Sequence, residues 1–216
     1  MYQGVHNLAA RYRDIAQTPE IPRRLPRGTH GLDPSLVAAS QRARLLEAVG
    51  GAVAEKGYAA ARIDDIVRAA GVSKKTFYEH FQDKLGCFLA AYEAASDDLY
   101  EHVRLAQDGA EGWIDRTRAG IHAYLRWLAA EPALARVFLI EVAAAGPEAA
   151  ERRERLRDRY AERMRELQDD NGRVPDEIFN AVVAAADDLV VRRLRAGRDV
   201  RDLEPLLLEL QVALLR

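Results

Sequence analysis

The chain has 216 residues, of which 31% are charged and 49% are hydrophobic, and its formal net charge is −2. This composition excludes a disordered chain and allows a sizeable core. No apolar run approaches the roughly 20 residues that cross a bilayer, and the first residues lack the apolar stretch of a secretory signal. The single cysteine, Cys87, excludes an internal disulfide. We therefore expect a soluble, cytoplasmic protein in which Cys87 is a buried core thiol.

The small net charge conceals an uneven distribution along the chain. Residues 1–85 carry 13 Lys and Arg against 9 Asp and Glu, which gives +4, and the remainder of the chain carries −6. A basic N-terminal part on an acidic body is typical of proteins that touch a polyanion at one end. The excess is small, so the charge only supports what the residue pattern indicates.

Residues 1–34 are rich in Pro and Gly, which deny the stretch over 21–31 a continuous helix. We interpret residues 1–34 as an extended basic arm. A plain disordered leader is the alternative that the residues leave open. The arm carries three arginines that could contact a polyanion: Arg23, Arg24 and Arg27.

The next segment has the pattern of three short helices, over about 36–56, 63–70 and 74–81. Apolar residues recur at helical spacing in the first two. Gly71 is expected to end the second helix, and Ser73 to cap the third. A helix, a glycine turn and a short helix in such close succession form the plan of a helix-turn-helix.

The rest of the chain predicts helices only, because no alternating β pattern occurs in it. The expected class is therefore all-α. Helical stretches are predicted to begin near the following residues: Asp83, Trp113, Pro132, Glu148, Pro175 and Asp202.

The densest motif is Gly57-Tyr58 followed, over residues 63–84, by IDDIVRAAGVSKKTFYEHFQDK. It resembles the DNA-binding signature of the tetracycline-repressor (TetR) family, with Asp-Ile, Ala-Gly-Val-Ser, Thr-Phe-Tyr and Phe-x-Asp-Lys in register. The resemblance implies a three-helix helix-turn-helix domain over 35–84 and a helical effector-binding and dimerisation bundle over 85–216. It also implies a homodimer that binds double-stranded operator DNA.

The resemblance places residues 74–80 on the recognition helix, with Lys75 and Thr76 facing base edges. A lysine can donate to guanine O6 and N7, and a threonine offers a hydroxyl and a methyl group. Other positions match residues that grip phosphates, which fix register without reading sequence. The expected DNA-binding set is Arg62, Ser73, Lys74, Lys75, Thr76, Tyr78, His80 and Lys84, whereas Phe77 and Phe81 are expected in the core.

Two residues depart from the family pattern. Lys75 stands where a small residue is frequent, so the base preference of relatives cannot be transferred to this chain. Arg62 stands where a Ser or Thr usually caps the second helix, so the cap hydroxyl is missing. Arg62 is either a phosphate contact or a solvated surface charge.

The resemblance also implies two sites in the C-terminal bundle. The last two helices would pair between subunits through apolar stripes, unless these stripes pack inside one subunit: Ile178, Val182, Ala185, Leu189, Leu206 and Leu210. A small, largely apolar effector would bind among the middle helices, although each candidate taken alone fits the core better than a pocket: Trp113, His122, Tyr124, Trp127, Phe138, Glu141 and Tyr160. The carboxylate of Glu141 could instead pair with Arg136 or Arg153.

These features predict a sequence-specific transcriptional regulator, a repressor that a small effector releases from DNA. An activator, or a helical DNA-binding or interaction protein without an effector, is the alternative. No nucleophile–base pair, phosphate-binding glycine loop or metal-ligand spacing is evident, so we expect no enzyme, no cofactor and no metal site.

Overall fold

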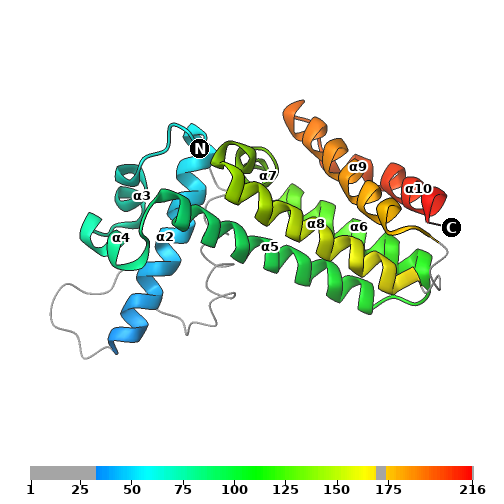
Figure 1. The fold of residues 1–216 in the computed structure, drawn as a ribbon, viewed down its shortest axis with the longest axis horizontal. Coiled ribbons are helices and arrows are strands. Elements are labelled where there is room, and N and C mark those ends of the chain that lie inside the picture. The colour runs from blue at the N-terminus through cyan, green and yellow to red at the C-terminus, as the bar shows by residue number, and fades with distance from the viewer. Residues whose placement is uncertain (1–32, 169–173, 216) are drawn as a thin grey trace. The chain divides into compact units, whose positions relative to one another are not determined.

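The computed structural model describes residues 33–168 and 174–215, and within these ranges every regular element is a helix (Figure 1). The expected all-α class is confirmed. The arm residues Arg23, Arg24 and Arg27 lie outside the described residues. The contacts divide the chain into two compact units, the first ending at Ala95 and the second beginning at Ser96.

The first unit holds the three predicted short helices and the start of a longer one. These are α2 (Pro34–Lys56), α3 (Ile63–Ala70), α4 (Lys74–His80) and α5 (Lys84–Asp108), of which α5 continues into the second unit. Their ends follow local chemistry. Asp33 caps α2 by accepting from the backbone N–H of Ser35 at 2.8 Å, and Asp83 accepts from that of Gly86 at 2.7 Å at the start of α5.

Each helix of the first unit contributes buried side chains to its core. Val49 of α2, Ile66 of α3, Phe77 of α4 and Phe88 of α5 are all almost completely buried. Cys87 is also fully buried, as predicted, and burial raises the pKa of its thiol to about 12. A thiol in this state is inert at neutral pH, because the nucleophile is the thiolate.

The second unit consists of the end of α5 and the remaining helices, of which α8 packs on α9 and α6 packs on α10. The elements are α6 (Trp113–Ala130), α7 (Pro132–Leu139), the 3-10 helix η1 (Glu141–Ala145), α8 (Pro147–Gln168), α9 (Asp176–Arg195), the 3-10 helix η2 (Val200–Leu203) and α10 (Glu204–Leu214).

Two differences from the expected elements occur in this unit. The helix predicted to begin near Pro132 ends at Leu139 and is followed by η1, and the last helix is preceded by η2. The side chain of Asp199 caps η2 by accepting from the backbone N–H of Arg201 at 2.9 Å, which explains the start of this turn.

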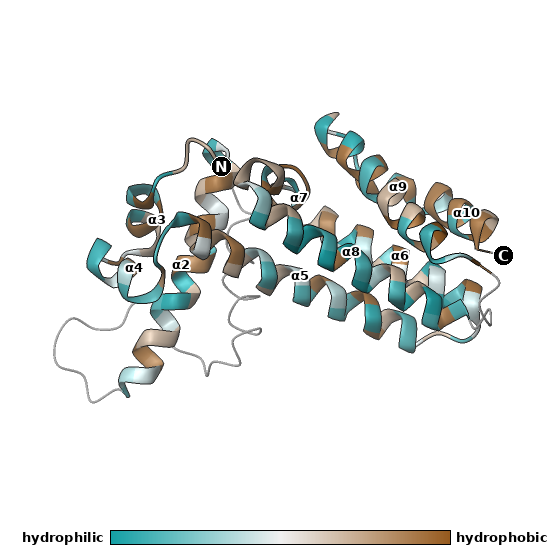
Figure 2. Cartoon of the chain, viewed as in Figure 1, coloured by the Kyte–Doolittle hydropathy of each residue, from teal (hydrophilic) through white to brown (hydrophobic). Residues whose placement is uncertain are grey.

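A core cluster of the second unit gathers around Phe179 and Val182 of α9, Ala161 of α8 and Leu215 at the end of α10. Figure 2 shows the contrast between the largely hydrophilic surface of α8 and the hydrophobic α10. Within the described ranges, no helix combines the length and the apolar character needed to span a bilayer.

Candidate functional site

The turn between α3 and α4 sets the geometry of the candidate site. Gly71 has φ +64°, in the left-handed region that favours glycine, and its N–H donates to carbonyls in the last turn of α3. The N–H of Val72 donates to the carbonyl of Val67 at 3.1 Å. Ser73 then caps α4 by accepting from the N–H of Thr76 at 3.0 Å. These bonds confirm the predicted turn and cap.

Helix α4 is anchored by one residue and presents the others outward. Phe77 is its only buried side chain. The side chain of Lys75 is 87% exposed, with its ammonium 4.0 Å from Glu79, and Tyr78 is 57% exposed. The hydroxyls of Ser73 and Thr76 lie 3.0 Å apart. The face of α4 away from Phe77 therefore offers cationic and hydroxyl groups to a partner.

Two carboxylates at the start of α3 hold cations near this face. Asp64 pairs with Lys74 at 2.7 Å. Asp65 accepts from Lys56 at 2.7 Å and from the backbone N–H of Arg62 at 3.1 Å, and these two hydrogen bonds, in that order, hold the pKa of Asp65 below its usual value. The Asp65 carboxylate thus supplies one half of a capping box at the start of α3, and the side chain of Arg62 is exposed.

Lys84 has a structural role that the motif did not predict. Its ammonium donates to the carbonyls of Tyr58 and Ala61, at 2.7 and 2.9 Å, and lies 4.2 Å from the centre of the Tyr58 ring. Lys84 therefore ties the start of α5 to the loop that precedes α3. At most one of its three N–H groups is left to reach a phosphate.

His80 is half-buried at the end of α4, where its Nε2 lies 3.2 Å from Oε1 of Gln41. Burial, and then the positive charge of Arg42, holds the pKa of His80 below its ordinary value of 6.5. The imidazole is therefore neutral at neutral pH in the free protein and adds no positive charge to the candidate surface.

We expect a fall in pH below 6.5 to reduce the free energy of unfolding of the wild type more than that of His80→Gln. The unfolded chain takes up a proton at the ordinary pKa while the folded chain resists it, so the unfolded state binds more protons in this window and stability is lost as pH falls. Urea denaturation of both proteins across this pH range measures the difference. Parallel pH profiles would contradict the depressed pKa.

The second unit contains a cavity of about 70 Å³ among α5, α6, α8, α9 and α10. Of the seven residues predicted for an effector pocket, Tyr124 and Tyr160 line it. Its polar wall was not predicted, because no local motif marks these positions: Gln107, Thr117, Arg163, Asp187 and Gln211.

The other five predicted pocket residues do not line this cavity. Trp127 and Phe138 are buried, and Nε1 of Trp127 donates to Asp98 at 2.7 Å. His122 is exposed and lies 2.9 Å from Glu204. Trp113 packs against the Phe179 cluster, and Glu141 is the half-buried first residue of η1.

The residues predicted for a dimer interface divide in the same way. Val182 is fully buried inside its own subunit, and Ile178 packs against the same cluster, so these two belong to the core of one chain. Ala185, Leu189 and Leu210 are half-buried. Leu206 is 46% exposed, and Leu214, about two helical turns further along α10, is 45% exposed.

The first unit has the architecture of helix-turn-helix DNA-binding proteins, with a short recognition helix behind a glycine turn. Residues 51–91 match the family of bacterial regulatory proteins called the tetR family. This segment of the chain therefore carries the DNA-binding region of that family, as the sequence motif predicted.

Similar proteins agree with this assignment. The HTH-type transcriptional activator FasR of Mycolicibacterium smegmatis is 33% identical over 116 residues, which are 53% of this chain and 53% of FasR. The matched part thus spans about half the length of this relative.

Solved structures show the same fold over a larger share of the chain. The fatty acid degradation regulator FadR of Bacillus halodurans has a TM-score of 0.71 and 19% identity, covering 80% of this chain and 98% of its own. FadR of Bacillus subtilis, solved with stearoyl-CoA, has a TM-score of 0.71 and 17% identity, covering 79% and 97%. Identities this low show the fold alone.

Proposed function

We propose that this chain is a cytoplasmic, sequence-specific transcriptional regulator that binds double-stranded operator DNA as a homodimer. The observation that carries the proposal is the arrangement of α4, which is anchored by Phe77 and turns Lys75 and Tyr78 outward. A helix presented in this way fits a major groove, where each base pair offers a distinct pattern of donors and acceptors. The family match over 51–91 supports it.

The exposed residues take different roles in this proposal. Lys75 and Thr76 read base edges, and Tyr78 and the exposed Arg62 contact phosphates. Lys74 must leave Asp64 to reach DNA, so it contributes less. Lys84 acts mainly by holding the loop before α3 in place.

The homodimer would form through the outer faces of α9 and α10. Leu206 and Leu214 are large apolar side chains that remain exposed on α10, with Leu210 half-buried between them. Burying such a stripe against a second copy removes apolar surface from water. Two subunits would present their recognition helices to half-sites about 34–36 Å apart.

The cavity of the second unit is proposed as the effector site, since the related fold of Bacillus subtilis FadR holds stearoyl-CoA. An effector that binds better to the DNA-free form releases DNA, and this gives a repressor without catalytic activity. The name of FasR favours an activator as the second candidate.

Selection from a random DNA pool by the full chain, followed by gel shift, tests the proposal. We expect a near-palindromic site bound far more tightly than unrelated DNA. A reporter carrying that site upstream of a promoter separates the candidates, since a repressor lowers its output and an activator raises it. A chain that enriches no sequence from the pool would refute the proposal.

A further inference from the structure

The cavity of the second unit exposes no uncompensated charge in the described residues. We propose that it takes an uncharged ligand with a hydrogen-bond-accepting carbonyl on a small apolar body, such as an ester or an amide, and that it rejects a free carboxylate. This inference rests on the proposed function only in naming the ligand class of its effector site.

Among the described residues that line the cavity, Arg163 is the one cation, and its guanidinium already has partners. Its Nη2 pairs with Asp108, its Nη1 lies 3.3 Å from Glu166, and its Nε donates to Oε1 of Gln107 at 3.1 Å. A ligand carboxylate would have to displace these partners and lose its own hydration. Moving the carboxylate from water into the cavity therefore costs free energy that the occupied guanidinium does not return.

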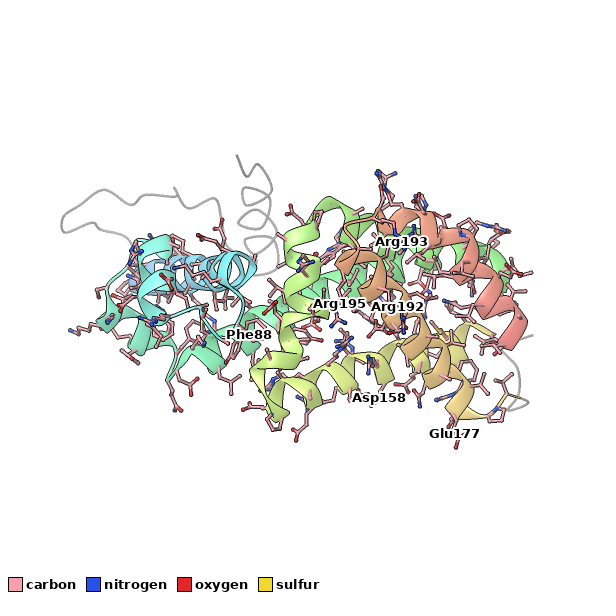
Figure 3. The ribbon with its side chains drawn as sticks, turned by 90° about the horizontal axis from the view of Figure 1, so that it is seen from above. Phe88, Asp158, Glu177, Arg192, Arg193 and Arg195 are labelled. Atoms are coloured by element: carbon pink, nitrogen blue, oxygen red, sulfur yellow. The ribbon has the colours of Figure 1, made fainter. Side chains whose placement is uncertain are left out.

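Asp187 is the one anion among the lining residues that the structure describes, and two arginines of α8 compensate it. Arg153 and Arg157 donate to the same oxygen of Asp187, at 3.2 and 2.9 Å. Figure 3 labels two further arginines, Arg192 and Arg193, which lie near the C-terminal end of α9.

Arg192 and Arg193, near the end of α9, already have carboxylate partners. Arg192 pairs with Asp188 at 2.6 Å, and Arg193 with Asp202 at 3.5 Å. Neither arginine lines the cavity. A cationic ligand meets the converse obstacle, since Asp187 already holds two guanidinium groups.

Two glutamines supply neutral hydrogen-bonding groups instead. The side chains of Gln107 and Gln211 are buried in the cavity wall, and in the described part of the chain neither amide nitrogen has a protein acceptor. Because Arg163 holds Oε1 of Gln107, the NH₂ group of Gln107 is left to donate. A carbonyl oxygen is the natural acceptor for such a donor.

Gly120 of α6 leaves room for the side-chain amide of Gln107 to pack against the backbone of α6. A Cβ at position 120 would lie 2.5 Å from Nε2 of Gln107, so only glycine lets this amide lie flat there. The remaining surface is apolar and aromatic, with Ile121, Tyr124 and Leu207 among its members. A small cavity with aromatic walls suits a single-ring body, with specificity provided by a few polar groups.

The test measures binding of four ligands of one ring size to the full chain at neutral pH by calorimetry and saturation-transfer NMR. The ligands are methyl benzoate, benzamide, toluene and benzoate. We expect the ester and the amide to bind about tenfold more tightly than toluene and benzoate, a difference of about 1.4 kcal/mol. Tightest binding by benzoate, or no binding by any of the four, would overturn the proposal.

Substitutions of the two glutamines then distinguish the loss of a hydrogen bond to the ligand from a change in the shape of the cavity. Gln211→Leu and Gln107→Leu should each remove most of the preference for the ester over toluene and leave toluene binding unchanged. Gln168→Leu is the matched control, since this half-buried glutamine of α8 does not line the cavity. An unchanged ester preference in both cavity variants would contradict the roles of the two amides.

DNA binding is measured on the same protein samples without ligand. Loss of the ligand preference together with intact operator binding would reject the ligand class alone. Failure to bind any selected DNA would reject the proposed regulator and leave the ligand measurements to stand independently.

Discussion

Phe77→Ala is expected to destabilise the first unit by about 3–5 kcal/mol and to abolish specific DNA binding. Phe77 is the only buried side chain of the seven-residue α4, and its ring lies 5.9 Å from that of Phe81. A helix this short is not stable in isolation, so its position depends on this one side chain. Urea denaturation and gel shift on the selected operator measure the two effects.

Tyr78→Ala is the matched control for this prediction. It removes an adjacent aromatic ring that is 57% exposed, so we expect little loss of stability. Its DNA affinity should fall moderately and about equally on all sequences, because the proposed partner of Tyr78 is a phosphate. If Tyr78→Ala destabilised the fold as much as Phe77→Ala, the assigned anchor would be wrong.

Lys75→Ala is expected to change which DNA sequences are bound, with a loss of about 1–3 kcal/mol of discrimination at one base pair of each half-site. The side chain of Lys75 is 87% exposed, and its nearest carboxylate, Glu79, is 4.0 Å away, so little within the protein holds its ammonium back from DNA. Repeating the DNA selection with the variant and measuring affinities for single-base changes tests the effect.

Arg62→Ala serves as the comparison, because this exposed arginine is proposed to touch only phosphate. We expect Arg62→Ala to lower the affinity for all DNA sequences by a similar factor and to reduce the slope of log affinity against log salt concentration by about one. Lys74→Ala should have a smaller effect than either variant, since Asp64 already holds the ammonium of Lys74 at 2.7 Å. Identical selected sequences for wild type and Lys75→Ala would remove Lys75 from the base-reading set.

The helices of the helix-turn-helix segment were predictable because the residues that begin and end them act over a few positions. Helix α3 has the predicted bounds, and Gly71 and Ser73 form the turn and the cap that the spacing indicated. Caps and glycine turns depend on hydrogen bonds between residues a few positions apart, which the order of residues along the chain contains.

The roles of individual cationic side chains in this segment were less predictable. Lys84 lies in the motif like a phosphate contact, but its bonds to the carbonyls of Tyr58 and Ala61 join residues more than 20 positions apart. Asp65 likewise binds the backbone N–H of Arg62 at the start of α3, where the usual cap hydroxyl is missing. Whether Lys84 contacts DNA or carbonyl groups of its own chain depends on how the loop before α3 packs against the start of α5.

In the second unit, the local residue pattern was enough to predict the helices, whereas packing between distant segments sets the environment of each helix face. The stripe through Val182 is apolar whether it meets its own core or a second subunit, and packing places Val182 inside. Trp127 and Tyr124 share α6, but only Tyr124 lines the cavity. Helical periodicity fixes which residues share a face, whereas the partner of that face depends on contacts between residues distant in the chain.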